Sequence, residues 1–269
     1  MGRHDWISLT TDYGLSDGFV AACHGVIARI APAVRVIDVT HLVPPADVAR
    51  GAAVLAQAVP HLPRAVHVAV VDPGVGTERR GVVVEEADGL LVGPDNGLLP
   101  AAADALGGVR RVVVLDNPDW YAPTVSPTFH GRDVFAPVAA RLALGADPAT
   151  AGSTVDSATL VRLPDPVLVV GDGWLEAEVA TVDGFGNVQL AAPGSALDGL
   201  AGPLTVGGVR AVRATTFGHA PAGDLVVYVD SADRVAVAVN GGRAAAALGV
   251  TPGDVLRITT ARRGARRRA

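Results

Sequence analysis

The sequence predicts an α/β protein: a mostly parallel α/β sandwich domain followed by an all-β, barrel-like domain. Up to about residue 144, short β-branched runs alternate with longer helical segments, a pattern typical of βαβ units. Beyond Pro164 and Pro166, short apolar runs are separated by turns rich in Gly and Asp. We therefore expect a first domain at residues 1–163, a second at 167–261 and a disordered, Arg-rich tail at 262–269.

The individual elements follow from the same patterns. Strands of the first domain are expected where β-branched residues cluster, at 7–11, 34–40, 65–71, 81–85, 90–92 and 111–115. Apolar residues spaced by three and four predict helices at 19–30 and 48–59, and a further helix should begin near Asp133. Strands of the second domain are expected at 174–182, 188–190, 204–206, 225–229, 235–239 and 255–259.

Bulk properties exclude several classes of protein. Of the 269 residues 49% are hydrophobic, yet no apolar run approaches the roughly 18 to 20 residues of a membrane span. The N-terminus lacks the pattern of a secretory signal, so a cytoplasmic location is expected. A net charge of −5 argues against nucleic-acid binding, because phosphate contacts need a concentrated positive surface.

Metal binding is not expected from the sequence either. Cys23 is the single cysteine, which excludes an internal disulfide and makes a structural zinc site improbable. The seven histidines are scattered, without a pair at i and i+4 on one predicted helix. The prediction is therefore a protein without a metal.

Two polar segments, 72–80 and 128–133, carry the strongest chemical signal. They supply the carboxylate of Asp72, the guanidinium of Arg79 or its neighbour Arg80, and the imidazole of His130, without a Ser or Cys nucleophile. Asp72 ends a predicted buried strand, which is where ligands bind in open α/β sheets. This set suits the orientation or activation of water. The alternative is a purely structural cluster of ion pairs.

The loop after the first strand offers a second group of polar residues. It lacks the glycine fingerprint of a dinucleotide site. Asp12 instead can accept hydrogen bonds from a ribose diol, and Asp17 can pair with an ammonium group. The alternative is that Ser16 or Asp17 caps the following helix.

Two glycine-containing turns complete the candidates. Asn96 lies in an Asp-Asn-Gly turn whose default role is structural, although its amide can also meet a ligand. Phe185 and Asn187 flank a glycine in the second domain, where a ring can stack on a flat ligand and an amide can bond an adenine edge. The alternative for that segment is a plain Gly-rich hairpin.

Five motifs in order resemble those of the S-adenosyl-L-methionine (SAM) hydrolases, also called SAM hydroxide adenosyltransferases, which are related to the bacterial fluorinase and chlorinase. The resemblance spans about residues 7–260. The motifs are Thr-Thr-Asp-Tyr-Gly at 10–14, Val-Val-Asp-Pro-Gly-Val-Gly-Thr at 70–77, Pro-Asp-Asn-Gly-Leu-Leu at 94–99, Thr-Phe-His-Gly-Arg-Asp at 128–133 and Phe-Gly-Asn at 185–187.

The resemblance implies a homotrimer whose sites lie between the first domain of one subunit and the second domain of its neighbour. It implies SAM as the substrate, with no further cofactor. Asp12 resembles the residue that holds the ribose diol, and Asp17 the one that meets the methionine amine. The implied adenine contacts, some of them on short gapped matches, are Phe185, Asn187, Phe217, Ser231, Asn240 and Gly241.

The same resemblance distinguishes hydrolases from halogenating relatives. Asp72, Arg79 and His130 match the water-handling triad of the hydrolases, whereas the halogenating members carry tyrosines at the aspartate and histidine positions. We therefore expect SAM hydrolysis to adenosine and L-methionine, by attack of water at ribose C5′. The alternatives are a halide adenosyltransferase and a non-catalytic sensor of SAM or adenosine.

Overall fold

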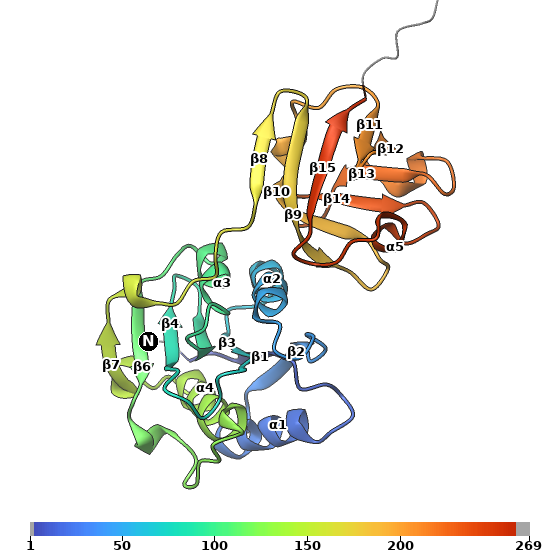
Figure 1. The fold of residues 1–269 in the computed structure, drawn as a ribbon. Helices are drawn as coiled ribbons and strands as arrows, with labels where there is room; N and C mark the ends of the chain where they lie inside the picture. The colour runs from blue at the N-terminus through green and yellow to red at the C-terminus, as the bar shows by residue number, and fades with distance from the viewer. Residues whose placement is uncertain (1–2, 262–269) are drawn as a thin grey trace, which may run out of the picture. The chain divides into compact units, whose positions relative to one another are not determined.

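A computed structural model describes residues 3–261, and the predicted disordered tail at 262–269 lies outside the described residues. By its internal contacts the chain divides into two compact units, Met1–Leu163 and Pro164–Ala269. The first unit combines helices with one mixed sheet, and the second is built mainly of strands (Figure 1). The predicted α/β fold class with a barrel-like second part is confirmed.

The first unit contains a seven-stranded sheet in the order β2-β1-β3-β5-β4-β6-β7. Its strands are β1 (Trp6–Thr11), β2 (Arg35–Thr40), β3 (Val66–Val70), β4 (Gly81–Glu85), β5 (Leu90–Pro94), β6 (Arg111–Leu115) and β7 (Gly152–Val155). Strands β2, β1, β3 and β5 pair in parallel, whereas β4, β6 and β7 join the sheet by antiparallel pairing. The sheet is thus parallel over one half and antiparallel over the other.

Helices cover both faces of this sheet. They are α1 (Phe19–Ile30), α2 (Val48–Ala58), α3 (Pro100–Ala105) and α4 (Ala136–Ala143), the last preceded by a π-helical turn η3 (Gly131–Phe135). One core joins α1 and α4 to the sheet, and a second joins α2 and α3 to the opposite face. Alternation along the strands separates the two cores: in β4, Val83 packs into the first, and Val82 and Val84 pack into the second.

The second unit holds a closed barrel in which β10-β14-β13-β12-β11-β15-β9 returns to β10, with β8 added outside β9. The strands are β8 (Leu168–Gly171), β9 (Trp174–Val182), β10 (Val188–Pro193), β11 (Leu204–Val206), β12 (Val209–Arg213), β13 (Leu225–Val229), β14 (Arg234–Val239) and β15 (Val255–Thr260), with one helix, α5 (Ala244–Leu248). Burial alternates strictly along β9, which places Leu175, Ala177 and Val179 in the barrel core.

Short 3-10 turns connect these elements. They are η1 (Val59–His61), η2 (Pro118–Trp120), η4 (Pro148–Thr150), η5 (Ser157–Thr159), η6 (Gly194–Leu197) and η7 (Phe217–His219). Within residues 3–261, no helix combines the length and apolar character that crossing a bilayer would require.

Candidate active site

Asp72 follows β3, a fully buried central strand of the sheet, after one intervening residue, Val71. Strand β1 runs parallel to β3 with Thr11 opposite Val70, so Asp12 follows its strand at the same sheet edge. This is the edge at which open α/β sheets bind ligands. The parallel pairing therefore places two of the predicted acidic residues at the ligand-binding end of the sheet.

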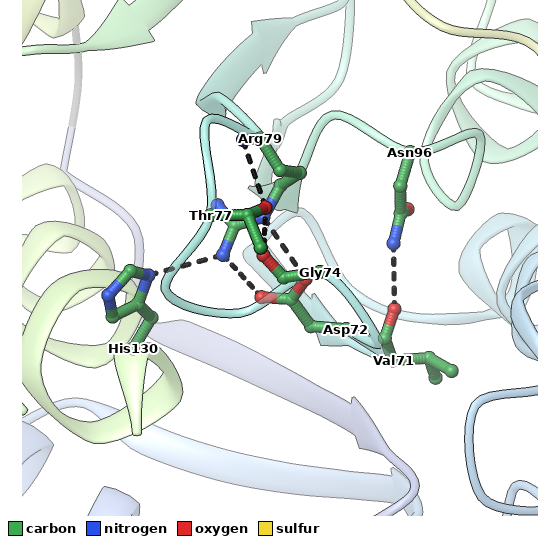
Figure 2. Close-up of polar contacts among 7 residues, drawn as sticks. All are labelled: Val71, Asp72, Gly74, Thr77, Arg79, Asn96 and His130. Atoms are coloured by element: carbon green, nitrogen blue, oxygen red, sulfur yellow. Dashed lines mark hydrogen bonds and ion pairs between the residues drawn. The ribbon is translucent and has the colours of Figure 1, made fainter. Parts of the chain in front are cut away.

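The loop after Asp72 folds back so that Arg79 meets the carboxylate that begins it. Hydrogen bonds from Val75 N to the Asp72 carbonyl (3.2 Å) and from Thr77 N to the Gly74 carbonyl (3.2 Å) form two consecutive turns. The Thr77 hydroxyl donates to the Gly74 carbonyl at 2.6 Å and accepts from the Arg79 N–H at 3.3 Å. These contacts fix the direction in which Arg79 leaves the loop (Figure 2).

Arg79 links Asp72 to His130. Its Nε donates to Asp72 Oδ1 at 3.0 Å, and one terminal nitrogen donates to Oδ2 of the same carboxylate. That terminal nitrogen also lies 3.2 Å from His130 Nδ1 (Figure 2). The side chains of Asp72 and Arg79 are only 5% and 10% exposed, so this is a nearly dry ion pair with an imidazole at one end.

His130 is positioned by an irregular helix start. Pro137, near the start of α4, has no N–H to donate to the Asp133 carbonyl four residues earlier. The backbone N–H of Ala122 donates to that carbonyl instead, at 2.8 Å. The helix opens into the π-helical turn η3, with His130 directly before it. Such turns are frequent at functional sites, and this one presents His130 to Arg79.

Two glycines permit the close approaches on which the site depends. Gly76 has φ of +77°, and a Cβ there would lie 2.4 Å from the Pro127 carbonyl oxygen, in the segment that leads to His130. A Cβ on Gly131 would lie 1.9 Å from the Tyr13 hydroxyl. A side chain at either position would therefore push the two polar segments apart or displace the tyrosine.

Burial shifts the acid–base properties of the cluster. It raises the pKa of Asp72, although the neighbouring Arg79 partly opposes that shift. Burial and then the positive charge of Arg79 lower the pKa of His130. Burial is also the main reason that the pKa of Tyr13 lies far above its ordinary value. At neutral pH the cluster therefore holds a neutral imidazole beside a carboxylate with raised proton affinity.

The structure distinguishes the two adjacent arginines. Arg80 donates from Nε to Asp95 Oδ2 at 2.9 Å and from a terminal nitrogen to the Thr159 carbonyl at 2.6 Å. Asp95 is 2% exposed in its side chain and also accepts from the Val161 N–H at 2.9 Å. Arg80 thus closes a separate ion pair, and Arg79 is the arginine that meets Asp72 and His130.

The other predicted residues of the first unit have different surroundings. Asp12 Oδ2 accepts from the Ala46 N–H at 2.9 Å, and Asp17 lies in an exposed loop. Helix α1 begins after Gly18 without a side-chain cap, so the capping role considered for Ser16 or Asp17 is wrong. Asn96 donates to the Val71 carbonyl at 2.9 Å (Figure 2), which ties the turn to the residue before Asp72. Its side-chain oxygen accepts from the Leu98 N–H at 3.2 Å.

In the second unit, Phe185 and Asn187 lie in the turn between β9 and β10, as the hairpin interpretation predicted. Asp183 closes the turn by accepting from the Phe185 and Asn187 N–H groups, both at 2.9 Å, and from the Asn187 side-chain amide at 2.8 Å. Phe185 is 80% exposed on this hydrogen-bonded turn, and Phe217 is half exposed. An exposed aromatic ring on a fixed turn suits stacking on a flat ligand.

The remaining predicted residues of this unit lie on loops between strands. Phe217 packs edge-on to Tyr228 with ring centroids 5.9 Å apart. Ser231 and Gly241 are exposed, and the Asn240 side-chain amide donates to the Ala220 carbonyl at 2.7 Å.

Sequence reasoning did not assign a role in the site to Tyr13 or Asp133. Tyr13 lies among Phe19, Phe129 and Gly131, with Asp72 and Arg79 close enough to influence its pKa. Asp133 accepts from both Arg132 Nε (2.6 Å) and the Ser126 N–H (2.9 Å), which braces the loop that carries His130. Tyr13 belongs to the motif at 10–14 and Asp133 to the motif at 128–133, so membership in these motifs was the sequence signal that could have identified them.

The fold and the site place the chain in a class of proteins that join an α/β sheet covered on both faces to a closed β-barrel and carry a buried Asp–Arg–His cluster. Comparison with known families is specific. Residues 7–152 match the SAM hydroxide adenosyltransferase N-terminal domain, and residues 177–257 match the C-terminal domain of the same family. The chain belongs to the SAM hydroxide adenosyltransferase family.

Individual relatives agree with this assignment. A protein of Salinispora tropica named (R)-S-adenosyl-L-methionine hydrolase is 67% identical over 96% of this chain and 99% of its own length. A fluorinase of Nocardia brasiliensis is 28% identical over 70% of this chain and 71% of its own. The crystal structure of an uncharacterized conserved protein from Thermotoga maritima matches with a TM-score of 0.87 and 36% identity, over 94% of this chain and 99% of the other.

Proposed function

We propose that this protein hydrolyses SAM to adenosine and L-methionine. The observation that carries the proposal is the buried Asp72–Arg79–His130 cluster at the carboxyl edge of the sheet. It occurs in a chain of the SAM hydroxide adenosyltransferase family that is 67% identical to a protein named (R)-S-adenosyl-L-methionine hydrolase. In the proposed reaction a water oxygen bonds to ribose C5′ while the C5′–S bond breaks and its electron pair leaves with sulfur.

The hydrogen bonds suggest how the proton moves. A guanidinium can only donate, so His130 Nδ1 accepts from Arg79, and the neutral ring carries its proton on Nε2. That N–H is available to hold the attacking oxygen. Asp72 has a raised pKa, and each of its oxygens keeps a lone pair after bonding Arg79. We assign proton removal to Asp72, and positioning of the water to His130 and Arg79.

The leaving group imposes little on the protein. The sulfonium departs as a neutral sulfide that needs no proton, so no general acid, metal or cofactor is required by this mechanism. Well-oriented attack can supply on the order of 7 to 11 kcal/mol. A positioned base adds about 10²- to 10⁴-fold in rate. Catalysis then depends on positioning, partial desolvation and one proton transfer.

Substrate binding is assigned to both units. In the first unit, Asp12 would hold the ribose diol and Asp17 the methionine amine, with Asn96 near the sheet edge. In the barrel, the exposed Phe185 ring supports an adenine-stacking role. The other adenine contacts proposed are Asn187, Phe217, Ser231, Asn240 and Gly241.

We further propose a cytoplasmic homotrimer in which each site combines the first unit of one subunit with the barrel of its neighbour. The family resemblance supports this arrangement. Light scattering would measure the mass of the assembly in solution. Mixing two inactive variants would test whether each site is shared between two subunits. Asp72→Asn and Phe185→Ala chains, each inactive alone, should regain turnover at about one site in four when equal amounts are refolded together and assemble at random into trimers. Absence of any recovery would place each site within one subunit.

The activity itself is tested by incubating the purified chain with SAM in halide-free buffer and separating the products by liquid chromatography with mass detection. Equimolar adenosine and methionine are expected. Turnover that appears only when chloride is added, with a 5′-halo product, would identify a halide adenosyltransferase instead. Bound SAM that is never consumed would identify a sensor.

A further inference from the structure

Three side chains outside the proposed reaction converge beside the edge strand β2. They are His24 in α1, Asp38 in β2 and His41 directly after β2. His24 Nε2 lies 2.9 Å and His41 Nε2 lies 3.0 Å from the same oxygen, Asp38 Oδ1. All three potential ligand atoms lie within 4.8 Å of one another. The sequence alone does not predict this cluster, because His24 lies in a different segment from Asp38 and His41 and only the fold brings it beside them.

Hydrogen bonding does not account for the whole arrangement. The Asp38 carboxylate accepts from His24 Nε2 at 2.9 Å. His41 Nε2 lies only 3.0 Å from the same carboxylate, yet it has no hydrogen-bond partner among the described residues. His41 is 4% exposed, so this nitrogen is shielded from water. A buried ring nitrogen without a hydrogen bond is costly, and here it is directed at a carboxylate and a second imidazole.

The other nitrogen of His41 is already held. Its Nδ1 lies 2.8 Å from the Thr11 hydroxyl oxygen, which also accepts from the Tyr13 N–H at 3.2 Å. If His41 donates from Nδ1 to Thr11, its Nε2 carries a lone pair rather than a proton. This is the arrangement of metal-binding histidines, whose second nitrogen donates to a neighbouring acceptor that fixes the ring.

We propose that His24 Nε2, Asp38 Oδ1 and His41 Nε2 form a binding site for a divalent transition-metal ion of the Zn²⁺ type. Two imidazoles and one carboxylate suit zinc and its neighbours, whereas Mg²⁺ and Ca²⁺ prefer sites made of oxygen ligands alone. His24 and Asp38 are 36% and 43% exposed in their side chains, which provides an entry path and leaves room for water as a further ligand.

Such an ion would brace a loop of the proposed active site. His41 accepts through its backbone carbonyl from the Gly14 N–H at 2.7 Å, and its ring contacts Thr11. Residues 11–14, which include Asp12, are therefore attached to His41 at both ends. An ion that fixes His41 would stabilise this loop and hold α1 against β2. The site itself does not depend on the proposed hydrolysis.

Titration calorimetry with ZnCl2 on the untagged, EDTA-dialysed chain tests the proposal. One ion per chain should bind, with a rise in melting temperature. His24→Ala should weaken binding by more than the roughly 10- to 100-fold seen when an outer partner of a ligand is removed. The His24 side chain is about one-third exposed, so its removal spares the core, and Asp38→Asn provides a second variant. The exposed His61 offers a matched control, and His61→Ala should bind like the wild type.

Zinc K-edge X-ray absorption on the loaded chain adds a structural readout, with two imidazole nitrogens expected at about 2.0 to 2.1 Å from the metal. The proposal would be overturned by an absence of saturable binding in the wild type. It would equally be overturned if His24→Ala and Asp38→Asn bound zinc as tightly as the wild type, or if His61→Ala lost binding to the same extent.

Discussion

Asp72→Asn is the most informative single change, because it preserves the shape of the side chain and removes only its charge. The Asp72 and Arg79 side chains are 5% and 10% exposed and joined by two hydrogen bonds. In the variant, one of these bonds would become a contact between two N–H donors. Arg79 would keep a buried positive charge without a counter-charge, and its link to His130 would lose its anchor.

Both stability and catalysis should respond. Removing one partner of a buried ion pair costs about 3 to 5 kcal/mol, and we expect the lower end because an amide oxygen remains to accept from Arg79. At about 2 to 4 °C per kcal/mol, the melting temperature should fall by roughly 10 °C. If Asp72 removes the proton from water, kcat should fall about 10²- to 10⁴-fold.

The assay measures adenosine release at a temperature where both proteins are folded, and calorimetry measures SAM binding by the same samples. Binding should change little, since Asp72 is assigned to the water and not to the substrate. Glu78→Gln is the matched control, because Glu78 is an exposed carboxylate of the same loop. Turnover by Asp72→Asn within about threefold of the wild type would refute the assignment of the base.

Three further predictions concern pH and the neighbouring ion pairs. Because burial and Arg79 lower the pKa of His130, the ring stays neutral to a lower pH than a free imidazole, so its protonation should reduce kcat/KM with a midpoint below pH 6.5. A midpoint above pH 6.5 would contradict this. Arg80→Met should lower the free energy of unfolding by about 3 kcal/mol, because the buried Asp95 carboxylate loses its counter-charge. Well below the melting temperature, kcat should stay at the wild-type level. Loss of turnover there would implicate Arg80 in the reaction. Burial raises the pKa of Glu86 to about 8, so the folded state binds the extra proton and stability falls as pH rises from 4.5 to 8. Glu86→Gln should therefore raise the free energy of unfolding at pH 8 by up to about 4 kcal/mol, at ~1.4 kcal/mol per pKa unit, and change it very little at pH 4.5. Thermal melts that show the same gain at both pH values would mean that the charge of Glu86 is not responsible.

Much of the fold was predictable because local patterns and tertiary packing agree. Strands β4 and β6 and helix α1 have the bounds that the sequence predicts. The missed elements are short or lie at edges: α5 has five residues, β7 is an edge strand, and β12 has only one buried position. Their formation depends on neighbouring strands that local propensity does not describe.

The site was predictable as a set of motifs but not as a geometry. Adjacency in sequence could not separate Arg79 from Arg80, since the distinction depends on which carboxylate each side chain reaches. The π-helical turn that presents His130 follows from the missing N–H at Pro137 and from the Ala122 N–H, outside the helix, which donates to the Asp133 carbonyl instead. The cluster of His24, Asp38 and His41 needed the fold, because only the sheet and α1 bring these residues together.

The most direct test of the central claim is a single turnover of SAM in oxygen-18 water, followed by mass analysis of both products. We expect the label in the adenosine 5′-hydroxyl, one oxygen per molecule formed, and none in methionine. That result would mean that water attacks ribose C5′ as the C5′–S bond breaks. Adenosine that forms without the label would contradict hydrolysis at C5′ and, with it, the role assigned to Asp72, Arg79 and His130.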